Sequence, residues 1–74
     1  MIPLTELGKG NLGVIVQIRG GHGFHRKMAC LGLRVGKTVR NMTAIRGGPI
    51  VIEVEGTQIA IGRGMASKVL VEAI

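Results

Sequence analysis

One stretch of this sequence, residues 22–36 (HGFHRKMACLGLRVG), has the spacing of a helix, whereas the rest of the chain alternates as strands do. Three apolar side chains recur at i, i+4 and i+7 and therefore share one helical face: Phe24, Met28 and Leu31. Gly32 follows at the place where a left-handed glycine commonly ends a helix, so that Leu33 can pack back on Met28. Gly36 then predicts a turn with positive φ before the next strand. We therefore expect one short helix that is capped at its end and leads directly into a sheet.

Alternating apolar residues between glycine-rich turns predict five short strands. The strands cover residues 13–19, a stretch from Lys37 or Thr38 to Ala44, and residues 50–55, 58–61 and 69–71. The residues expected to face the core are Val14, Val16, Ile18, Val39, Ile50, Ile52, Val54, Ile59, Ile61, Val69 and Val71. In this register Ile15 falls on the outer face of the first strand, and the last strand lies at an edge of the sheet.

The remaining segments predict connections and an N-terminal arm. Met42 breaks the alternation that Val39 begins, which indicates a bulge or bend near residues 40–42. Residues 1–12 form an arm in which Leu4 and Leu7 make one turn against the sheet. Residues 45–49 form a loop, and residues 62–67 form a single turn of 3₁₀ helix.

Together these elements predict a mainly β fold, a small SH3-like barrel of about five strands with one helix inserted after the first. We expect residues 1–74 to form a single domain, since 74 residues support only one modest core. The N-terminus lacks the apolar region of a signal peptide, and no stretch approaches the roughly 18 apolar residues of a membrane-spanning helix. We therefore expect no membrane insertion. The single cysteine, Cys30, cannot form an internal disulfide, which favours a cytoplasmic protein.

The charge balance favours acidic partners. The formal net charge is +6, so nucleic acid, an anionic surface or an acidic protein would each be attracted. Phe24 is the only aromatic residue, however, and nucleic-acid-binding sheets commonly stack bases on exposed aromatic rings. The same shortage argues against a groove for polyproline ligands. Nucleic-acid binding is therefore the weaker alternative.

The order of short motifs along the chain resembles the FeoA family, ferrous-iron transport protein A. The motifs are Gly-Val-Ile-Val at residues 13–16, a basic pair before Leu-Gly-Leu at 31–33, Gly36, Gly-Pro-Ile-Val at 48–51, Gly56 with Ile-Ala-Ile at 59–61, and Met-Ala at 65–66 before Val-Leu-Val at 69–71. The resemblance covers nearly the whole chain. It implies an SH3-like barrel, a cytoplasmic location and a role in Fe(II) uptake. The implied partner is the membrane ferrous-iron transporter with its cytoplasmic GTPase domain, and no catalytic residue is carried over.

Few residues suggest chemistry. The sequence has no aspartate, and Glu53 and Glu55 are expected side by side on a solvated strand face rather than in a cleft, so we expect no enzyme activity. His22 and His25 stand three apart at the helix start and are the candidate metal ligands. They are too few for a stable site, so we expect no required cofactor and only weak Fe(II) or Zn(II) binding. The glycines of residues 20–23 precede the helix as in a phosphate loop, but the Walker pattern is missing.

Basic side chains around the helix are the best candidates for function. Arg26, Lys27 and Arg34 are expected to form a docking face for the transporter. Two alternatives remain, a metal-responsive barrel that uses the two histidines and a regulatory barrel that binds nucleic acid. Exposed edge strands also allow self-association into a homo-oligomer.

Overall fold

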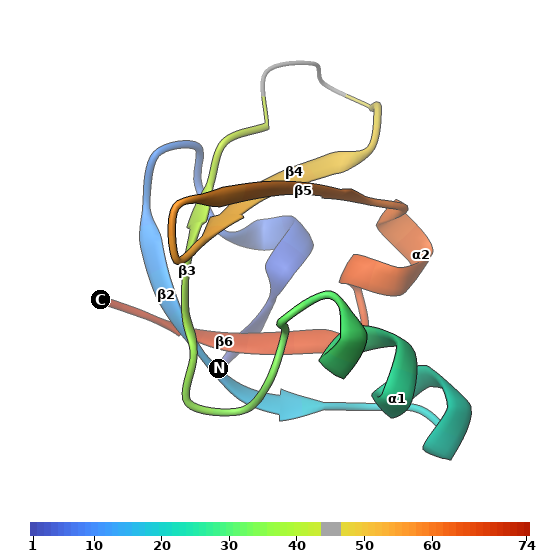
Figure 1. Ribbon diagram of the computed structural model, residues 1–74. Coiled ribbons are helices and arrows are strands. Elements are labelled where there is room, and N and C mark those ends of the chain that lie inside the picture. Colours follow the sequence, from blue (N-terminus) through green and yellow to red (C-terminus); the bar gives the residue numbers. More distant parts are fainter. Residues whose placement is uncertain (44–46) are drawn as a thin grey trace.

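The computed structural model describes residues 1–43 and 47–74, and their strands form one sheet (Figure 1). The elements in chain order are β1 (Ile2–Pro3), η1 (Leu4–Glu6), β2 (Leu12–Ile18), α1 (His22–Cys30), β3 (Thr38–Asn41), β4 (Ile50–Val54), β5 (Thr57–Ile61), α2 (Arg63–Ala66) and β6 (Val69–Ala73). The predicted Ile45 and Arg46 of the loop and Ala44 of the second strand lie outside the described residues.

The fold is mainly β, as predicted, with six antiparallel strands in the order β1-β6-β2-β3-β4-β5. The sheet curls into an SH3-like barrel that stays open, because β1 and β5 do not pair with each other. The sixth strand is β1, where the predicted arm pairs with β6 through Ile2 and Val71. Leu4 and Leu7 bury as predicted.

The predicted register of β2 is wrong in its first half. Ile15, expected outside, is fully buried, whereas Val14 and Val16 are only half-buried. The pairing of β2 with β6 shifts between Ile15 and Gln17, and this irregularity restores Ile18 to the core. An extra residue in a strand reverses which side chains face the core before and after it. A single alternating pattern therefore cannot predict burial along the whole of β2.

The prediction that the last strand lies at an edge of the sheet is also wrong, because β6 lies between β1 and β2. Leu70 is therefore buried together with Val69 and Val71. This placement brings β6 close to Gly13 of β2, where a Cβ atom would lie 3.2 Å from the side chain of Val71. A residue without a side chain is what allows the two strands to approach there.

The bulge predicted near residues 40–42 does not occur in the described pairings. Strand β3 ends at Asn41 with an unbroken register, and the Met42 N–H still donates to the Val51 carbonyl at 2.7 Å. The inward residue after Val39 is Asn41, which is only 5% exposed, and Met42 is half-buried. A pattern that counts only apolar residues overlooks a buried asparagine.

Helix α1 closes one side of the barrel and ends as predicted. Gly32 has φ 87°, its N–H donates to the Ala29 carbonyl at 3.0 Å, and the Leu33 N–H donates to the Met28 carbonyl at 2.9 Å. These two bonds make up a Schellman cap. Met28 and Leu33 are buried, and Phe24 and Leu31 pack against the core.

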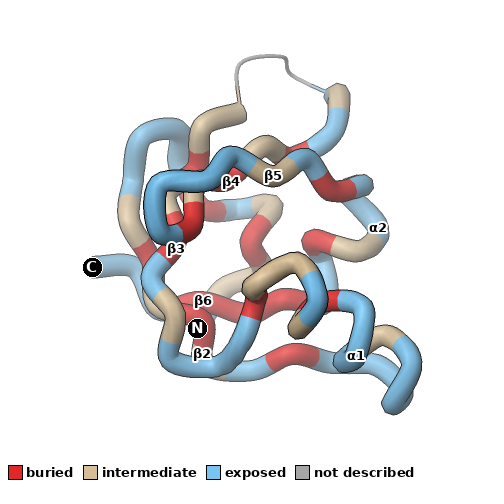
Figure 2. Tube along the Cα trace, viewed as in Figure 1, coloured by how far each residue is buried: buried red, intermediate tan, exposed pale blue. Residues whose placement is uncertain are grey.

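The core runs through the middle of the barrel between the sheet and the helices (Figure 2). The inward residues predicted for β4 are buried, and Ile59 of β5 is half-buried. Residues 63–66 form a short α-helix rather than the expected 3₁₀ turn, since the Ser67 N–H reaches the Arg63 carbonyl at 2.9 Å. The Lys68 ammonium lies 5.1 Å from the Phe24 ring centre, which joins α1 to the turn before β6.

Candidate docking site

The three predicted docking residues are exposed, and they lie on α1 and just beyond it. Arg26 and Lys27 project from the helix, and Arg34 follows its cap. The ion pairs of the described residues are Met1 with Glu72 and Lys37 with Glu55, so none of the three has a carboxylate partner there. Their charges are therefore available to an acidic surface.

The two candidate metal ligands, His22 and His25, are both exposed in the first turn of α1. Within residues 1–43 and 47–74, no group of three or more histidine, cysteine or acidic side chains is arranged to hold a metal ion. Cys30 is exposed at the far end of the same helix. Any metal bound by the two histidines would need further ligands from water or another molecule.

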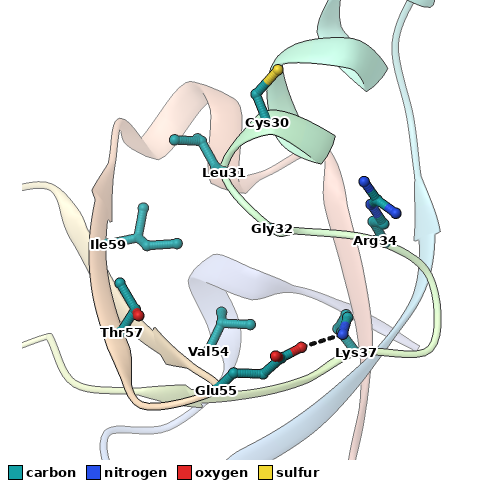
Figure 3. Close-up of a pocket in the computed structure, with 9 residues that line it drawn as sticks. All are labelled: Cys30, Leu31, Gly32, Arg34, Lys37, Val54, Glu55, Thr57 and Ile59. Atoms are coloured by element: carbon teal, nitrogen blue, oxygen red, sulfur yellow. Dashed lines mark hydrogen bonds and ion pairs between the residues drawn. The ribbon is translucent and has the colours of Figure 1, made fainter.

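A surface pocket of about 400 Å³ lies between the end of α1 and the β4–β5 hairpin (Figure 3). Its lining combines apolar side chains with a charged rim and consists of Cys30, Leu31, Gly32, Arg34, Lys37, Val54, Glu55, Thr57 and Ile59. Leu31 and Ile59 enter it from opposite walls (Figure 3). Of the predicted docking residues, the pocket includes Arg34 alone.

Sequence reasoning missed this pocket because its walls come from two separate segments of the chain, residues 30–37 and residues 54–59. The sequence predicted Ile59 to face inward, but it did not indicate that β5 lies at an edge of the sheet. In the structure Ile59 is incompletely covered, and its exposed part forms the pocket wall.

The rim of the pocket carries an ion pair between the Lys37 ammonium and the Glu55 carboxylate (Figure 3). Hydrogen bonding and the charge of Lys37 lower the pKa of the Glu55 carboxyl from its ordinary value. Glu55 was expected beside Glu53 on the strand face. Instead it occupies the turn after β4, with φ 50°, and its carboxylate pairs with Lys37.

Of the glycines before α1, Gly20 has a backbone conformation that favours glycine. Gly20 has φ 120°, and a Cβ there would lie 3.0 Å from the Phe24 ring. Gly21 is the residue before the helix, and it makes no side-chain cap. No helix among the described residues is long and apolar enough to cross a membrane.

Fold and site together define a small SH3-like domain with an exposed basic helix and a surface pocket. A model of the FeoA domain matches residues 2–73, and the chain belongs to the FeoA family. The predicted resemblance is thereby confirmed. The family is associated with Fe(2+) transport.

Relatives with similar sequences agree with this assignment. A Methanocaldococcus jannaschii protein named as an Fe(2+) transport protein A is 35% identical over 75 residues, which cover 97% of this chain and 87% of the relative. The crystal structure of an iron uptake regulatory protein, FeoA, is 40% identical with a TM-score of 0.90, covering 99% of this chain and 96% of that one.

A more distant structure shows the same fold. The FeoA of Stenotrophomonas maltophilia, solved in complex with zinc and described as a prokaryotic SH3-domain protein, is 23% identical with a TM-score of 0.78. The alignment covers 97% of this chain and 91% of that chain. The predicted SH3-like architecture is confirmed by this neighbour together with the sheet order.

Proposed function

We propose that this chain is a small cytoplasmic accessory protein of ferrous iron uptake. It docks on the cytoplasmic GTPase domain of the membrane Fe(II) transporter and modulates that transporter. The observation that carries the proposal is the FeoA domain match over nearly the whole chain. A relative at 35% identity, named for Fe(2+) transport, supports the same pathway.

The surface chemistry supports docking through charge. Arg26 and Lys27 are neighbours on one exposed helix, Arg34 stands past its end, and the net charge of the chain is +6. Exposed charges of one sign raise the rate at which an oppositely charged partner associates, and this effect weakens as salt increases. We therefore expect the docking partner to present acidic residues to α1.

The test is a binding measurement between the purified chain and the soluble GTPase domain of the ferrous-iron transporter from the same genome. Calorimetry or biolayer interferometry is run without nucleotide, with GDP and with a non-hydrolysable GTP analogue. We expect binding in at least one nucleotide state, with an affinity that falls as salt rises. Absence of binding in every state at low salt overturns direct docking.

A double charge reversal assigns the surface. Arg26→Glu/Lys27→Glu is expected to weaken binding by about tenfold or more, mostly through a slower association rate. The matched control is Lys9→Glu/Arg19→Glu, which makes the same change in net charge at exposed positions outside α1. If both double variants weaken binding equally, net charge acts without a defined face, and the assignment to α1 fails.

A second candidate function is weak metal binding at His22 and His25. The zinc complex of the Stenotrophomonas maltophilia FeoA favours this candidate, because it is a protein of the same fold with bound metal. Anaerobic titration with Fe(II) or Zn(II) is compared with that of His22→Ala/His25→Ala. Loss of binding in the variant supports a metal-responsive role, and unchanged binding removes the histidines as ligands.

A further inference from the structure

Strand β5 is an edge of the sheet that carries none of the usual protection. Within residues 1–43 and 47–74 it pairs with β4 alone, and its sequence, TQIAI, contains no charged residue and no proline. Edge strands in proteins are commonly blunted by charged residues, prolines or bulges, because their free N–H and C=O groups pair readily with another strand. The other edge, β1, is only two residues long.

The register of the hairpin shows which groups are free. The turn at Glu55 and Gly56 has positive φ at both positions, so Val54 and Thr57 form the hydrogen-bonded pair that closes a two-residue hairpin. Bonded and non-bonded pairs then alternate along the two strands. The N–H and C=O groups of Gln58 and Ala60 therefore point away from β4.

The opposite side of β4 agrees with this reading. Val51, the partner of Ala60, accepts from the Met42 N–H at 2.7 Å and donates to the Thr43 hydroxyl at 3.1 Å. Its backbone groups thus point toward the β3 side and not toward Ala60. Among the described residues, no turn or loop backbone bonds to β5.

The pocket lies beside this free edge. Thr57 and Ile59 project from β5 into it, and Leu31 faces them from the end of α1 (Figure 3). A strand added to β5 would place the side chain opposite Ile59 on the same face of the sheet, and therefore in the pocket. The apolar wall thus suits a segment with an aliphatic side chain at that position.

The charges near the pocket favour an acidic partner segment. Arg34 at the pocket rim has no carboxylate partner among the described residues, whereas Glu55 is already paired with Lys37. A second copy of this chain would bring another net charge of +6 to the same edge, which opposes self-pairing at low salt. An acidic partner is attracted instead.

We propose that β5 is a strand-addition site for an extended segment of a partner protein, with an aliphatic side chain in the pocket and an acidic residue near Arg34. The added strand pairs with the free groups of Gln58 and Ala60 and fills the open side of the barrel. The identity of that partner as the GTPase domain rests on the proposed function, whereas the site rests on the geometry of β5 and its pocket.

The test uses the full chain and the peptide acetyl-Glu-Val-Thr-Leu-Thr-Val-Glu-amide, which has one aliphatic face and acidic ends. Cys30 is the only cysteine, is exposed and lines the pocket, so its alkylation rate by iodoacetamide reports occupancy. We expect the peptide to slow alkylation and to shift the amide resonances of Gln58 and Ala60. No protection and no shift at millimolar peptide overturns the site.

Backbone pairing is tested on the peptide itself, so that folding of the protein does not enter. Two peptides carry N-methyl groups on alternate residues. One is methylated at the odd-numbered positions and the other at the even-numbered positions, and each set is called a phase. One phase is expected to bind about tenfold or more weakly, because it loses the donors that face β5, and the other phase to bind as the parent does. Equal binding of both methylated peptides and the parent overturns strand addition.

Two protein variants complete the design. Ala60→Pro removes an outward N–H without touching a bond to β4, and proline is tolerated at such an edge position. It is expected to bind the peptide weakly while its amide spectrum remains that of a folded protein. Arg34→Glu is expected to reverse the preference from the glutamate-ended peptide to a lysine-ended one, and an unchanged preference overturns the role of Arg34.

The outcomes separate this site from the proposed function. Peptide binding without binding of the GTPase domain keeps the site and rejects the partner. Binding of the GTPase domain that leaves Cys30 alkylation unchanged, together with no peptide binding, keeps the partner and rejects the site.

Discussion

The side-chain amide of Asn41 donates a hydrogen bond to the carbonyl oxygen of Leu7, which lies 34 residues earlier in the chain. The Asn41 side-chain oxygen also accepts from the Thr43 N–H at 2.9 Å. Both polar ends of a buried side chain are thus satisfied, and the arm before β2 is tied to the end of β3. The buried asparagine side chain therefore adds a tie to Leu7 beyond the backbone bonds that already link Asn41 to Gly10 and Asn11.

Asn41→Leu is expected to destabilise the protein by about 2 kcal/mol or more, because it leaves the buried Leu7 carbonyl and the part-buried Thr43 N–H without their partner. Urea unfolding followed by circular dichroism measures the change. The matched control is Asn11→Leu, at an exposed position, which is expected to change stability by less than about 0.5 kcal/mol. Equal effects of the two substitutions would contradict the structural role of Asn41.

Gly20→Ala and Gly23→Ala are expected to act in opposite directions. Gly20 has φ 120° and lacks room for a Cβ beside Phe24, so alanine there costs about 1–3 kcal/mol. Gly23 lies inside α1 with open space around its missing Cβ, so alanine there stabilises by up to about 1 kcal/mol. Thermal unfolding of the two variants measures the sign. Destabilisation by Gly23→Ala would contradict the open space found around Gly23 at the start of the helix.

Leu33→Ala is expected to cost about 2–5 kcal/mol, because Leu33 is 1% exposed and packs behind the helix cap. Val35, two residues later, is 63% exposed, so Val35→Ala serves as the control and is expected to be nearly neutral. Chemical denaturation separates the two variants. A loss for Leu33→Ala no larger than that for Val35→Ala would contradict the buried position of Leu33.

The ion pair at the pocket rim predicts a dependence on pH. Since Lys37 lowers the pKa of the Glu55 carboxyl, the contribution of the pair to stability is fully present above the ordinary glutamate pKa and is lost as pH falls through the lowered value. Carbon-detected NMR titration of Glu55 is expected to show the low midpoint. Lys37→Met, and high salt in the wild type, should each raise it. An unchanged midpoint in Lys37→Met would show that the two side chains do not pair in solution.

Much of the fold could be predicted from local sequence, and the errors share a physical cause. The cap of α1 depends on residues within six positions, so Gly32 and Leu33 could be assigned their places directly. The burial of Ile15 depends on an irregularity in pairing with β6, more than fifty residues away. The interior place of β6 depends likewise on the arm that pairs with it as β1. Neither partner is visible in the alternation of one strand.

The candidate site divides in the same way. Exposure of Arg26, Lys27 and Arg34 follows from their charge and could be predicted. Their function stays a prediction. The pocket could not be predicted, because it exists only where Leu31 and Ile59 face each other across the open side of the barrel. The pairing of Glu55 with Lys37 also depends on contacts between separate segments of the chain.

The position of β6 has a consequence for synthesis on the ribosome. Since β6 lies between β1 and β2, a nascent chain that ends before Val69 holds an arm and a first long strand with nothing between them. In such a chain the core residues Leu4 and Ile15 lack the side chains that β6 would place beside them. Such a chain cannot complete the barrel while it is being made, and we expect the domain to fold in one step once the last strand has left the exit tunnel.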